Sequence, residues 1–189
     1  MDGLLSVFTA FGLSSSAGLN AYLPLLVVAL LARTTDLVKL EQPWDALTSW
    51  WVIGVLVVLL LIEMLVDKVP AVDTVNDVIQ TFIRPVAGAI LFAASAGVIS
   101  DAHPVLALIC GLLVAGGVHA VKATARPVVT GTTGGLLNPV VSFLEDVLAL
   151  VVAILSILVP VLALVLLLVI VIWFIRRRRR GREKPSAVW

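Results

Sequence analysis

Charged residues are scarce in this chain of 189 residues. Asp, Glu, Lys and Arg together make up 13% of it, whereas 61% of the residues are hydrophobic. Soluble domains carry roughly a quarter charged residues. The mean hydropathy is correspondingly high, at +1.15. A chain with so few charges lacks the polar side chains that a soluble surface needs. The composition therefore excludes an ordinary soluble fold and predicts an integral membrane protein.

The chain also lacks the residues of common enzymes. Cys110 is its only cysteine, so no internal disulfide can form. Neither GxSxG, HExxH nor a phosphate-binding loop occurs. Asp73 and Asp77 share the DxxxD spacing of some membrane phosphotransferases, but the further acids and the Asp-Gly and Ala-Arg pairs of that pattern are missing. His119 has no second metal ligand nearby. We expect no enzyme, no cofactor and no metal, with a phosphotransferase as the least favoured alternative.

Long apolar runs take the place of those features. They predict an all-α polytopic integral membrane protein with about six transmembrane helices, some of them broken or re-entrant. Residues 140–175 are long enough for two spans with a turn near 156–160, or for one long helix kinked at Pro160. Residues 69–84 have the periodicity of a short interfacial helix. The predicted spans are residues 4–32, 50–66, 85–100, 105–121 and the two within 140–175.

The basic residues indicate the orientation in the membrane. Seven of the 13 Lys and Arg follow Trp173, five of them from Arg176 to Arg180. With six spans and this tail in the cytoplasm, only Arg33 and Lys39 lie outside, which the positive-inside rule favours over five spans. The sequence thus predicts one membrane domain over residues 1–175, a basic tail over 176–189, and both termini on the cytoplasmic side of the inner (plasma) membrane. The tail anchors this topology, and contact with anionic lipids is a second interpretation.

Two segments interrupt the apolar runs. Residues 123–143 read ATARPVVTGTTGGLLNPVVSF and include two prolines, three glycines and three threonines between Arg126 and Pro139. Residues 12–24 read GLSSSAGLNAYLP. Neither is expected to be one straight helix. Non-helical backbone at membrane depth needs other protein or a water-filled cavity around it. We therefore expect these two breaks to form the functional centre.

The two breaks share an order of residue types: hydroxyl residues, then Gly, Leu and Asn, then an apolar helix. These are Ser15, Ser16, Gly18, Leu19 and Asn20 in one, and Thr132, Thr133, Gly135, Leu136 and Asn138 in the other. In the six-span topology they cross the membrane in opposite directions, as in the inverted repeats of transporters. A chance match between segments of common residues is the alternative, and both interpretations stay open.

Four segments carry a resemblance to a known family. They are GLSSSAGLNAYLPLL near the start, the ExxxDKxPxxD run from Glu63 to Asp73, the RPVAGA that follows it, and GTTGGLLNPVVSFLED. Together they resemble a bacterial integral-membrane family known as domain of unknown function 4126. The resemblance covers roughly residues 4–171 and implies a compact helical membrane protein. It supplies no established substrate or catalytic residue.

Ionisable residues inside apolar helices are the remaining signal. A charged side chain at the centre of a membrane helix costs on the order of 2.5–3.5 kcal/mol, so it usually faces an interior or a partner. The sequence predicts a vestibule in which basic, hydroxyl and amide side chains bind an anionic group and acids carry a coupling proton. The binding residues are Ser15, Ser16, Asn20, Arg84, Lys122, Arg126, Thr132, Thr133 and Asn138; the proton-coupling acids are Glu63, Asp67, Glu145 and Asp146. Two structural interpretations stay open: acids and bases that merely pair, and asparagines that merely cap helices.

These patterns favour a small transporter or translocator of an anionic solute or lipid headgroup, coupled or not to protons. The alternative is a non-transporting structural or accessory subunit of a membrane complex. Membrane lipids are the expected partners and nucleic acid is not. Small residues in 85–100 and 105–121 let helices approach closely, and we expect them to mediate a homo-oligomer.

Overall fold

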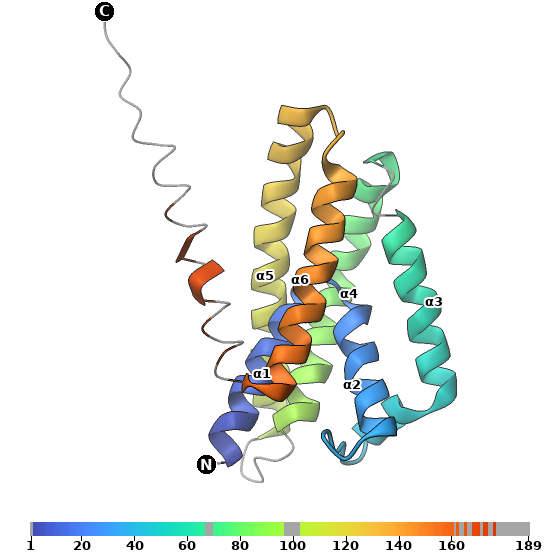
Figure 1. The fold of residues 1–189 in the computed structure, drawn as a ribbon, viewed down its shortest axis with the longest axis vertical. Coiled ribbons are helices and arrows are strands. Elements are labelled where there is room, and N and C mark those ends of the chain that lie inside the picture. Colours follow the sequence, from blue (N-terminus) through green and yellow to red (C-terminus); the bar gives the residue numbers. More distant parts are fainter. Residues whose placement is uncertain are drawn as a thin grey trace, which may run out of the picture.

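A computed structural model gives the chain as a bundle of helices (Figure 1). It describes residues 2–66, 70–96 and 103–160, together with scattered residues between 162 and 176. Over this part the structure is helical, without strands, so the predicted all-α class is confirmed. The elements are α1 (Asp2–Leu19), α2 (Tyr22–Thr34), the 3-10 helix η1 (Trp44–Thr48), α3 (Trp50–Val66), α4 (Pro70–Ala96), α5 (Pro104–Thr133) and α6 (Asn138–Leu158).

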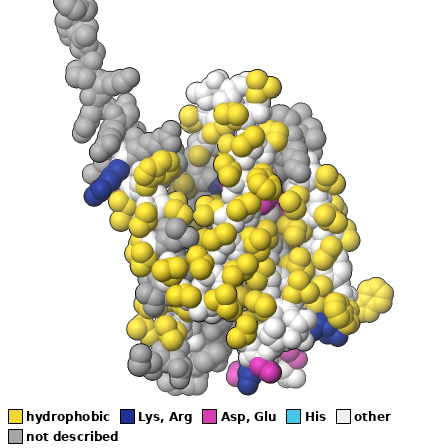
Figure 2. All heavy atoms as spheres, viewed as in Figure 1, with side chains coloured by type: hydrophobic (Ala, Val, Ile, Leu, Met, Phe, Trp, Pro, Cys, Tyr) yellow, Lys and Arg dark blue, Asp and Glu magenta, His cyan; other side chains and the backbone are white. Residues whose placement is uncertain are grey.

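The bundle is apolar outside and partly polar inside. Figure 2 shows hydrophobic side chains over most of one face, with charged side chains gathered at its lower end. Several charged side chains are instead buried, among them Arg84, which is fully inaccessible. Val78–Ser95 within α4, and the whole of α5 and α6, are long and apolar enough to cross a membrane; α1, α2 and α3 are shorter apolar helices. An apolar outer surface with charged side chains inside is the distribution expected of an α-helical membrane protein.

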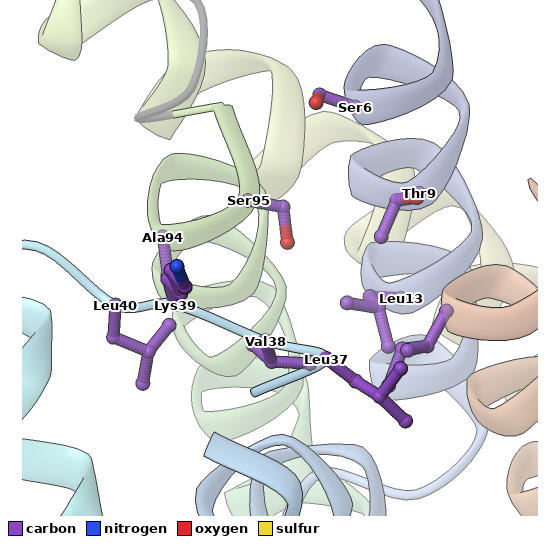
Figure 3. Close-up of a pocket in the computed structure, with 10 residues that line it drawn as sticks. Ser6, Thr9, Leu13, Leu37, Val38, Lys39, Leu40, Ala94 and Ser95 are labelled. Carbon is purple, nitrogen blue, oxygen red and sulfur yellow. The ribbon is translucent and has the colours of Figure 1, made fainter. Parts of the chain in front are cut away.

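The first two helices form a hairpin that enters the bundle and returns. In Figure 1, α1 rises from the lower end and α2 descends to the same end. Hydrogen bonds from Thr9 to Ser156 and from Ser16 to Ala149 show that α1 runs antiparallel to α6. The segment after α2 lies against the start of α1, where Lys39 and Thr9 line one cavity of about 150 Å³ (Figure 3).

This hairpin confirms the predicted break in the first apolar run. Residues 4–32 do not cross the bundle once, as the six-span prediction required; two helices meet at Asn20 instead. The connection after α2 therefore lies at the same end as the start of α1 (Figure 1). The charge count had placed that connection, with Arg33 and Lys39, on the opposite side from the N-terminus.

The expected interfacial helix over residues 69–84 does not exist as a separate element. Instead, α4 continues through Pro85 to Ala96. A proline inside a helix removes one hydrogen bond and crowds the preceding turn. Close packing of α4 against α5 compensates here: a Cβ added at Gly88 or Gly111 would collide with the backbone of the other helix.

The second break is also shorter than predicted. Helix α5 continues through Pro127 to Thr133, and only residues 134–137 leave the helical path. Gly134 and Gly135 have φ values of 61° and 82°, which is the left-handed conformation that ends many helices. The prediction that residues 123–143 are not one straight helix is confirmed, but most of the segment is helical. Helix α6 ends at Leu158, in the region where the sequence predicts a turn or a kink.

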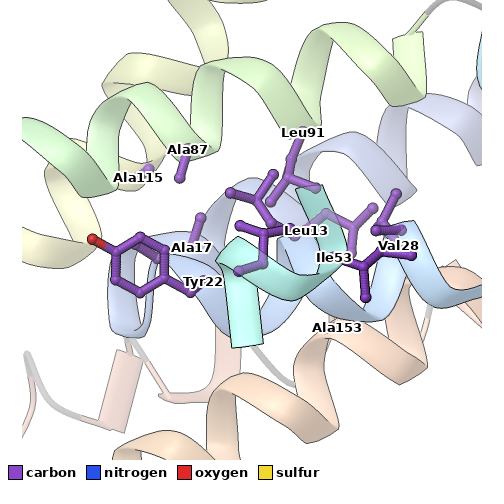
Figure 4. Packing of buried hydrophobic residues seen from close by; sticks show 13 residues of the cluster. Leu13, Ala17, Tyr22, Val28, Ile53, Ala87, Leu91, Ala115 and Ala153 are labelled. Carbon is purple, nitrogen blue, oxygen red and sulfur yellow. The ribbon is translucent and has the colours of Figure 1, made fainter. Parts of the chain in front are cut away.

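Small residues bring α1, α4 and α5 together inside the chain. A Cβ added at Gly18 would lie 2.6 Å from the carbonyl oxygen of Ala115. Ala17, Ala87 and Ala115 belong to the same buried cluster, together with Leu13, Tyr22 and Leu91 (Figure 4). Gly88, Gly111 and Ala115 are thus used for packing within one chain, and the expected homo-oligomer stays a prediction.

Candidate functional site

The tip of the α1–α2 hairpin is built around Asn20. Its side-chain oxygen accepts hydrogen bonds from the backbone N–H groups of Tyr22 at 3.1 Å and Leu23 at 2.9 Å. This is the geometry of a helix N-cap, and it satisfies two donors at the start of α2. The side-chain nitrogen of Asn20 donates to Oδ1 of Asp146 in α6, at 2.9 Å. Asn20 therefore caps its own helix and ties the tip to α6.

A lysine from α5 binds the other helix end at the same tip. Lys122 Nζ donates to the carbonyl oxygen of Leu19, the last residue of α1, at 2.9 Å. The C-terminus of a helix carries partial negative charge and the N-terminus partial positive charge. Lys122 lies at the negative end of α1, and Asp146 lies near the positive end of α2. The charges of α5 and α6 therefore stabilise both ends that the break exposes.

Lys122 also belongs to an ion-paired group that we call the α5–α6 cluster, made of Lys122, Arg126 and Glu145. Oε2 of Glu145 lies 2.9 Å from Lys122 Nζ and 2.8 Å from Arg126 Nη2. The exposed fractions of the side chains are 2% for Lys122, 8% for Arg126 and 17% for Glu145. One carboxylate oxygen thus serves two nearly buried cations, and the acid is the member nearest the surface.

A second group, the Arg84 cluster, joins α3, α4 and α5. Arg84 Nη2 donates to Glu63 Oε1 at 2.9 Å, and Arg84 Nη1 lies 2.9 Å from Nδ1 of His119. Nε2 of His119 lies 3.0 Å from the hydroxyl of Thr81. Arginine can only donate, so Nδ1 of His119 must accept. The neutral ring then carries its proton on Nε2 and donates to Thr81.

The two clusters lie along one buried stripe of α5. His119, Lys122 and Arg126 are all buried and follow one another at spacings of three and four residues. The described interior also holds three acids and three cations in all: Glu63, Glu145, Asp146, Arg84, Lys122 and Arg126. If all are ionised, the interior is neutral. Buried ions need partners of opposite sign, so an added anion must arrive with a proton or displace an acid.

The structure places some of the predicted site residues close together. Asn20, Lys122, Arg126, Glu145 and Asp146 surround the hairpin tip, and Arg84 pairs with Glu63 next to them along α5. Two of these contacts correct the prediction in detail. The backbone N–H groups of Tyr22 and Leu23 at the start of α2 are bound by Asn20 and do not face an anion, and three of the four acids, Glu63, Glu145 and Asp146, already contact polar side chains.

Other predicted residues lie elsewhere or serve packing. The hydroxyl of Ser15 bonds the carbonyl of Phe11 in its own helix, and Ser16 bonds Ala149. Thr132 and Thr133 bond carbonyls one turn back in α5, and Asn138 pairs with Thr130. Asp67 and residues 177–180 lie outside the described part of the chain.

The two breaks do not face each other. Asn20 lies against Asp146, which is eight residues beyond Asn138, or about 12 Å along α6. Helices α1 and α5 run in the same direction, since Ser14 contacts Gly111 and Leu19 contacts Lys122. Both hairpins therefore turn toward the same end of the bundle (Figure 1). This pair of hairpins lacks the opposite orientation that an inverted repeat requires.

Sequence reasoning missed the partners of Arg84. Thr81 and Gln80 were assigned to an interfacial helix, and His119 was considered as a metal ligand. Gln80 is 2% exposed, and its Oε1, like Nε of Arg84, has no hydrogen-bond partner among the described residues. The signal that could have identified Gln80 and Arg84 is their spacing of four residues, which places them on one helix face. Among the described residues, no group of three or more His, Cys, Asp or Glu could hold a metal ion.

A helical hairpin bound at its tip by Asp146 and Lys122, with buried ion pairs beside it and helices whose outer faces are apolar, defines a polytopic α-helical membrane protein with a charged interior. The chain belongs to the DUF4126 family, a domain of unknown function, whose family model matches residues 7–180. No curated protein and no solved structure matches the chain.

Proposed function

We propose that the protein carries an anionic group across the membrane and that this anion exchanges with the carboxylate of Glu145. The observation that supports the proposal is the α5–α6 cluster, in which two nearly buried cations converge on one oxygen of a less buried acid. Lys and Arg are also the residues that bind carboxylates and phosphates. Glu145 thus occupies the position that the anion of a substrate would take.

The exchange requires a proton to keep the interior neutral. When Glu145 binds a proton, its carboxyl loses its negative charge and its attraction for Lys122 and Arg126 weakens. A monoanion then pairs with the two cations, and the sum of charges is unchanged. When the anion leaves, Glu145 loses its proton and pairs again. One proton and one monoanion therefore move together, which is the proton coupling that the sequence predicts.

The hairpin tip connects this exchange to a larger rearrangement. Lys122 binds both Glu145 and the carbonyl of Leu19 at the end of α1. An anion that draws Lys122 away from Leu19 removes a charge that stabilises that helix end. The tip is then held chiefly by Asn20 and Asp146, and movement of the hairpin would alternate the side from which the cluster is reached.

A proton-uptake assay in reconstituted vesicles tests the proposal. Vesicles containing a pH-sensitive dye receive an inward gradient of chloride or inorganic phosphate, with gluconate as the comparison anion and valinomycin to set the membrane potential. We expect anion-dependent uptake of protons by the wild type. Glu145→Gln removes the exchangeable proton and Arg126→Ala removes a cation, so both abolish coupled uptake. The matched control is Glu41→Gln, at an exposed acid outside the bundle.

Two outcomes overturn the assignment of the site. Full activity of both variants would show that the α5–α6 cluster does not carry the anion. If the wild type moved neither these anions nor an anionic lipid, the proposal that the protein is a transporter would itself be wrong.

The outer helix α3 favours a second candidate, an accessory subunit. Trp50, Gly54 and Val58 line an apolar groove on α3, and Trp51 is 87% exposed. A partner helix could occupy that groove. Purification in mild detergent distinguishes the candidates, because a subunit is recovered with a partner in fixed stoichiometry whereas a carrier is recovered without one.

A further inference from the structure

The α5–α6 cluster also suggests what kind of molecule brings the anion. Resting on the function proposed above, we infer that the anion is the headgroup of an amphiphile dissolved in the membrane, such as an anionic phospholipid. Its headgroup reaches Lys122 and Arg126 from the side, between α5 and α6, while its acyl chains stay in the lipid. Three features of the described residues support this lateral access.

The first feature is the way α5 and α6 meet. In the half of the bundle that α1 occupies, α1 lies between them: Ser14 bonds the carbonyl of Gly111 in α5, and Ser16 bonds that of Ala149 in α6. Helix α1 ends at Leu19. From the level of Leu19 onward, polar contacts between described side chains of α5 and α6 include those of Lys122 and Arg126 with Glu145, and of Thr130 with Asn138.

These bridges differ from the other helix contacts of the fold. Gly88 and Gly111 bring the backbones of α4 and α5 together with no room for a side chain. The α5–α6 contact instead depends on long side chains that reach across from one helix to the other. An ion pair between long side chains can open without moving a backbone, so this side of the bundle can admit a headgroup.

The second feature is a gradient of exposure toward lipid. Lys122 is 2% exposed, Arg126 is 8% and Glu145 is 17%, so the cluster opens outward past Glu145. The outer surfaces of α5 and α6 are apolar: Val128 is 62% exposed, and Phe143 and Leu144 are 57% and 59% exposed.

The third feature is the match between this surface and an amphiphile. The exposed apolar side chains of α5 and α6, the two helices that hold the cluster, suit acyl chains. The guanidinium of Arg126 and the ammonium of Lys122 suit a phosphate. The headgroup would replace Glu145 on the cations, and the chains would lie along Phe143, Leu144 and Val128.

A lipid-flipping assay tests the inference directly. The purified protein is placed in phosphatidylcholine vesicles with a trace of phosphatidylglycerol labelled on its acyl chain by a fluorophore that dithionite bleaches. Without flipping, only the outer half of the label bleaches. We expect nearly complete bleaching with the wild type, and half with labelled phosphatidylcholine. Arg126→Ala should slow the flipping by about tenfold or more, since it removes one partner of a buried charge pair. The exposed-site variant Glu41→Gln should keep the wild-type rate.

A photocrosslinking experiment gives a readout that does not depend on activity. Phosphatidylglycerol with a photoreactive acyl chain should label peptides that contain Val128, Phe143 and Leu144 more strongly than photoreactive phosphatidylcholine does. Arg126→Ala should remove that preference while the protein elutes as a folded species. Labelling of α3 around Val58 and Leu61 is the internal control, since lipid contacts there should not depend on headgroup or on Arg126.

The outcomes separate this inference from the function on which it rests. In one outcome, inorganic phosphate drives Glu145-dependent proton uptake while phosphatidylglycerol is neither flipped nor preferentially crosslinked. The inference of lateral access by an amphiphile is then wrong, whereas the proposed function as an anion carrier is retained. If the two lipids label α5 and α6 equally, with or without Arg126, the contact is that of ordinary surrounding lipid and the inference is overturned. If neither phosphate nor lipid moves, both proposals fail.

Discussion

Asn20 and Asp146, which are 126 residues apart in the chain, are joined by a hydrogen bond of 2.9 Å. The same asparagine caps α2 through its other side-chain atom. Asn20 thus caps the helix that follows the first break and fixes the position of the hairpin tip relative to α6. Because hydrogen bonds to a charged group are stronger than neutral ones, this contact should contribute measurably to stability.

Substitutions at Asn20 separate its two functions. Asn20→Ala removes the cap and the bond to Asp146, and we expect it to destabilise the protein by about 2–4 kcal/mol. Asn20→Asp keeps cap acceptors but places a second carboxylate beside Asp146, so it should also destabilise. The measurement is unfolding in detergent, with the exposed-site variant Glu41→Gln as control. An Asn20→Asp variant as stable as the wild type would show that only the cap matters.

A pair of glycines tests the close packing of α1 against α5. A Cβ at Gly18 would lie 2.6 Å from the carbonyl oxygen of Ala115, whereas one at Gly117 would have no neighbour within 4 Å. Gly18→Ala should therefore destabilise by about 1–3 kcal/mol, as overpacking does. Gly117→Ala should be neutral or stabilising by up to about 1 kcal/mol, because alanine favours helix. Thermal unfolding in detergent measures both, and equal effects would contradict the packing.

The pair of Glu63 and Arg84 tests whether the buried charges depend on each other. Both side chains are at most 1% exposed and lie 2.9 Å apart. Glu63→Gln or Arg84→Gln alone leaves one charge in the interior, so each should cost about 3–5 kcal/mol. The double variant removes both charges and should cost clearly less than the sum. Additive losses in a double-mutant cycle would show that the two residues do not interact.

The hydrogen bonds of His119 predict its tautomer. Arg84 donates to Nδ1, so the neutral ring should carry its proton on Nε2. Nitrogen-15 NMR of the histidine-labelled protein checks this, and His103→Gln leaves His119 as the only histidine of the chain. A proton on Nδ1 in the wild type would contradict the contact. Arg84→Gln should allow the tautomers to mix, since a glutamine can accept as well as donate.

Composition and break motifs predicted much of the fold. The scarcity of charge predicted a membrane protein, and Gly18, Leu19 and Asn20 predicted a break where α1 and α2 meet. A span was expected from residue 105, and α5 begins at Pro104. The prolines inside α4 and α5 were harder to interpret, because neither Pro85 nor Pro127 ends its helix. Near Pro85, close packing of α4 against α5 stabilises the helix, and local sequence does not reveal such a contact between distant residues.

The sequence indicated which charged residues belong to the candidate site, but it did not indicate how they pair. Buried charge is costly enough that Arg84, Lys122, Arg126 and Glu145 could be selected from the sequence. Their pairing could not be predicted from the sequence, because it depends on how the helices pack. In one half of the bundle α1 lies between α5 and α6, and the α1–α2 hairpin enters from one end. Similar motifs at Asn20 and Asn138 suggested one joint site, yet Asn20 bonds Asp146 and Asn138 bonds Thr130.

The most direct test of the central claim is coupled transport by Glu145→Gln, compared with its stability. If the α5–α6 cluster is the binding site, this variant should lose anion-dependent proton uptake while its unfolding in detergent changes by about 1–3 kcal/mol or less, because Glu145 is the least buried member of its cluster. Uptake at the wild-type rate, or loss of uptake only because the protein no longer folds, would show that the ion pairs serve structure alone.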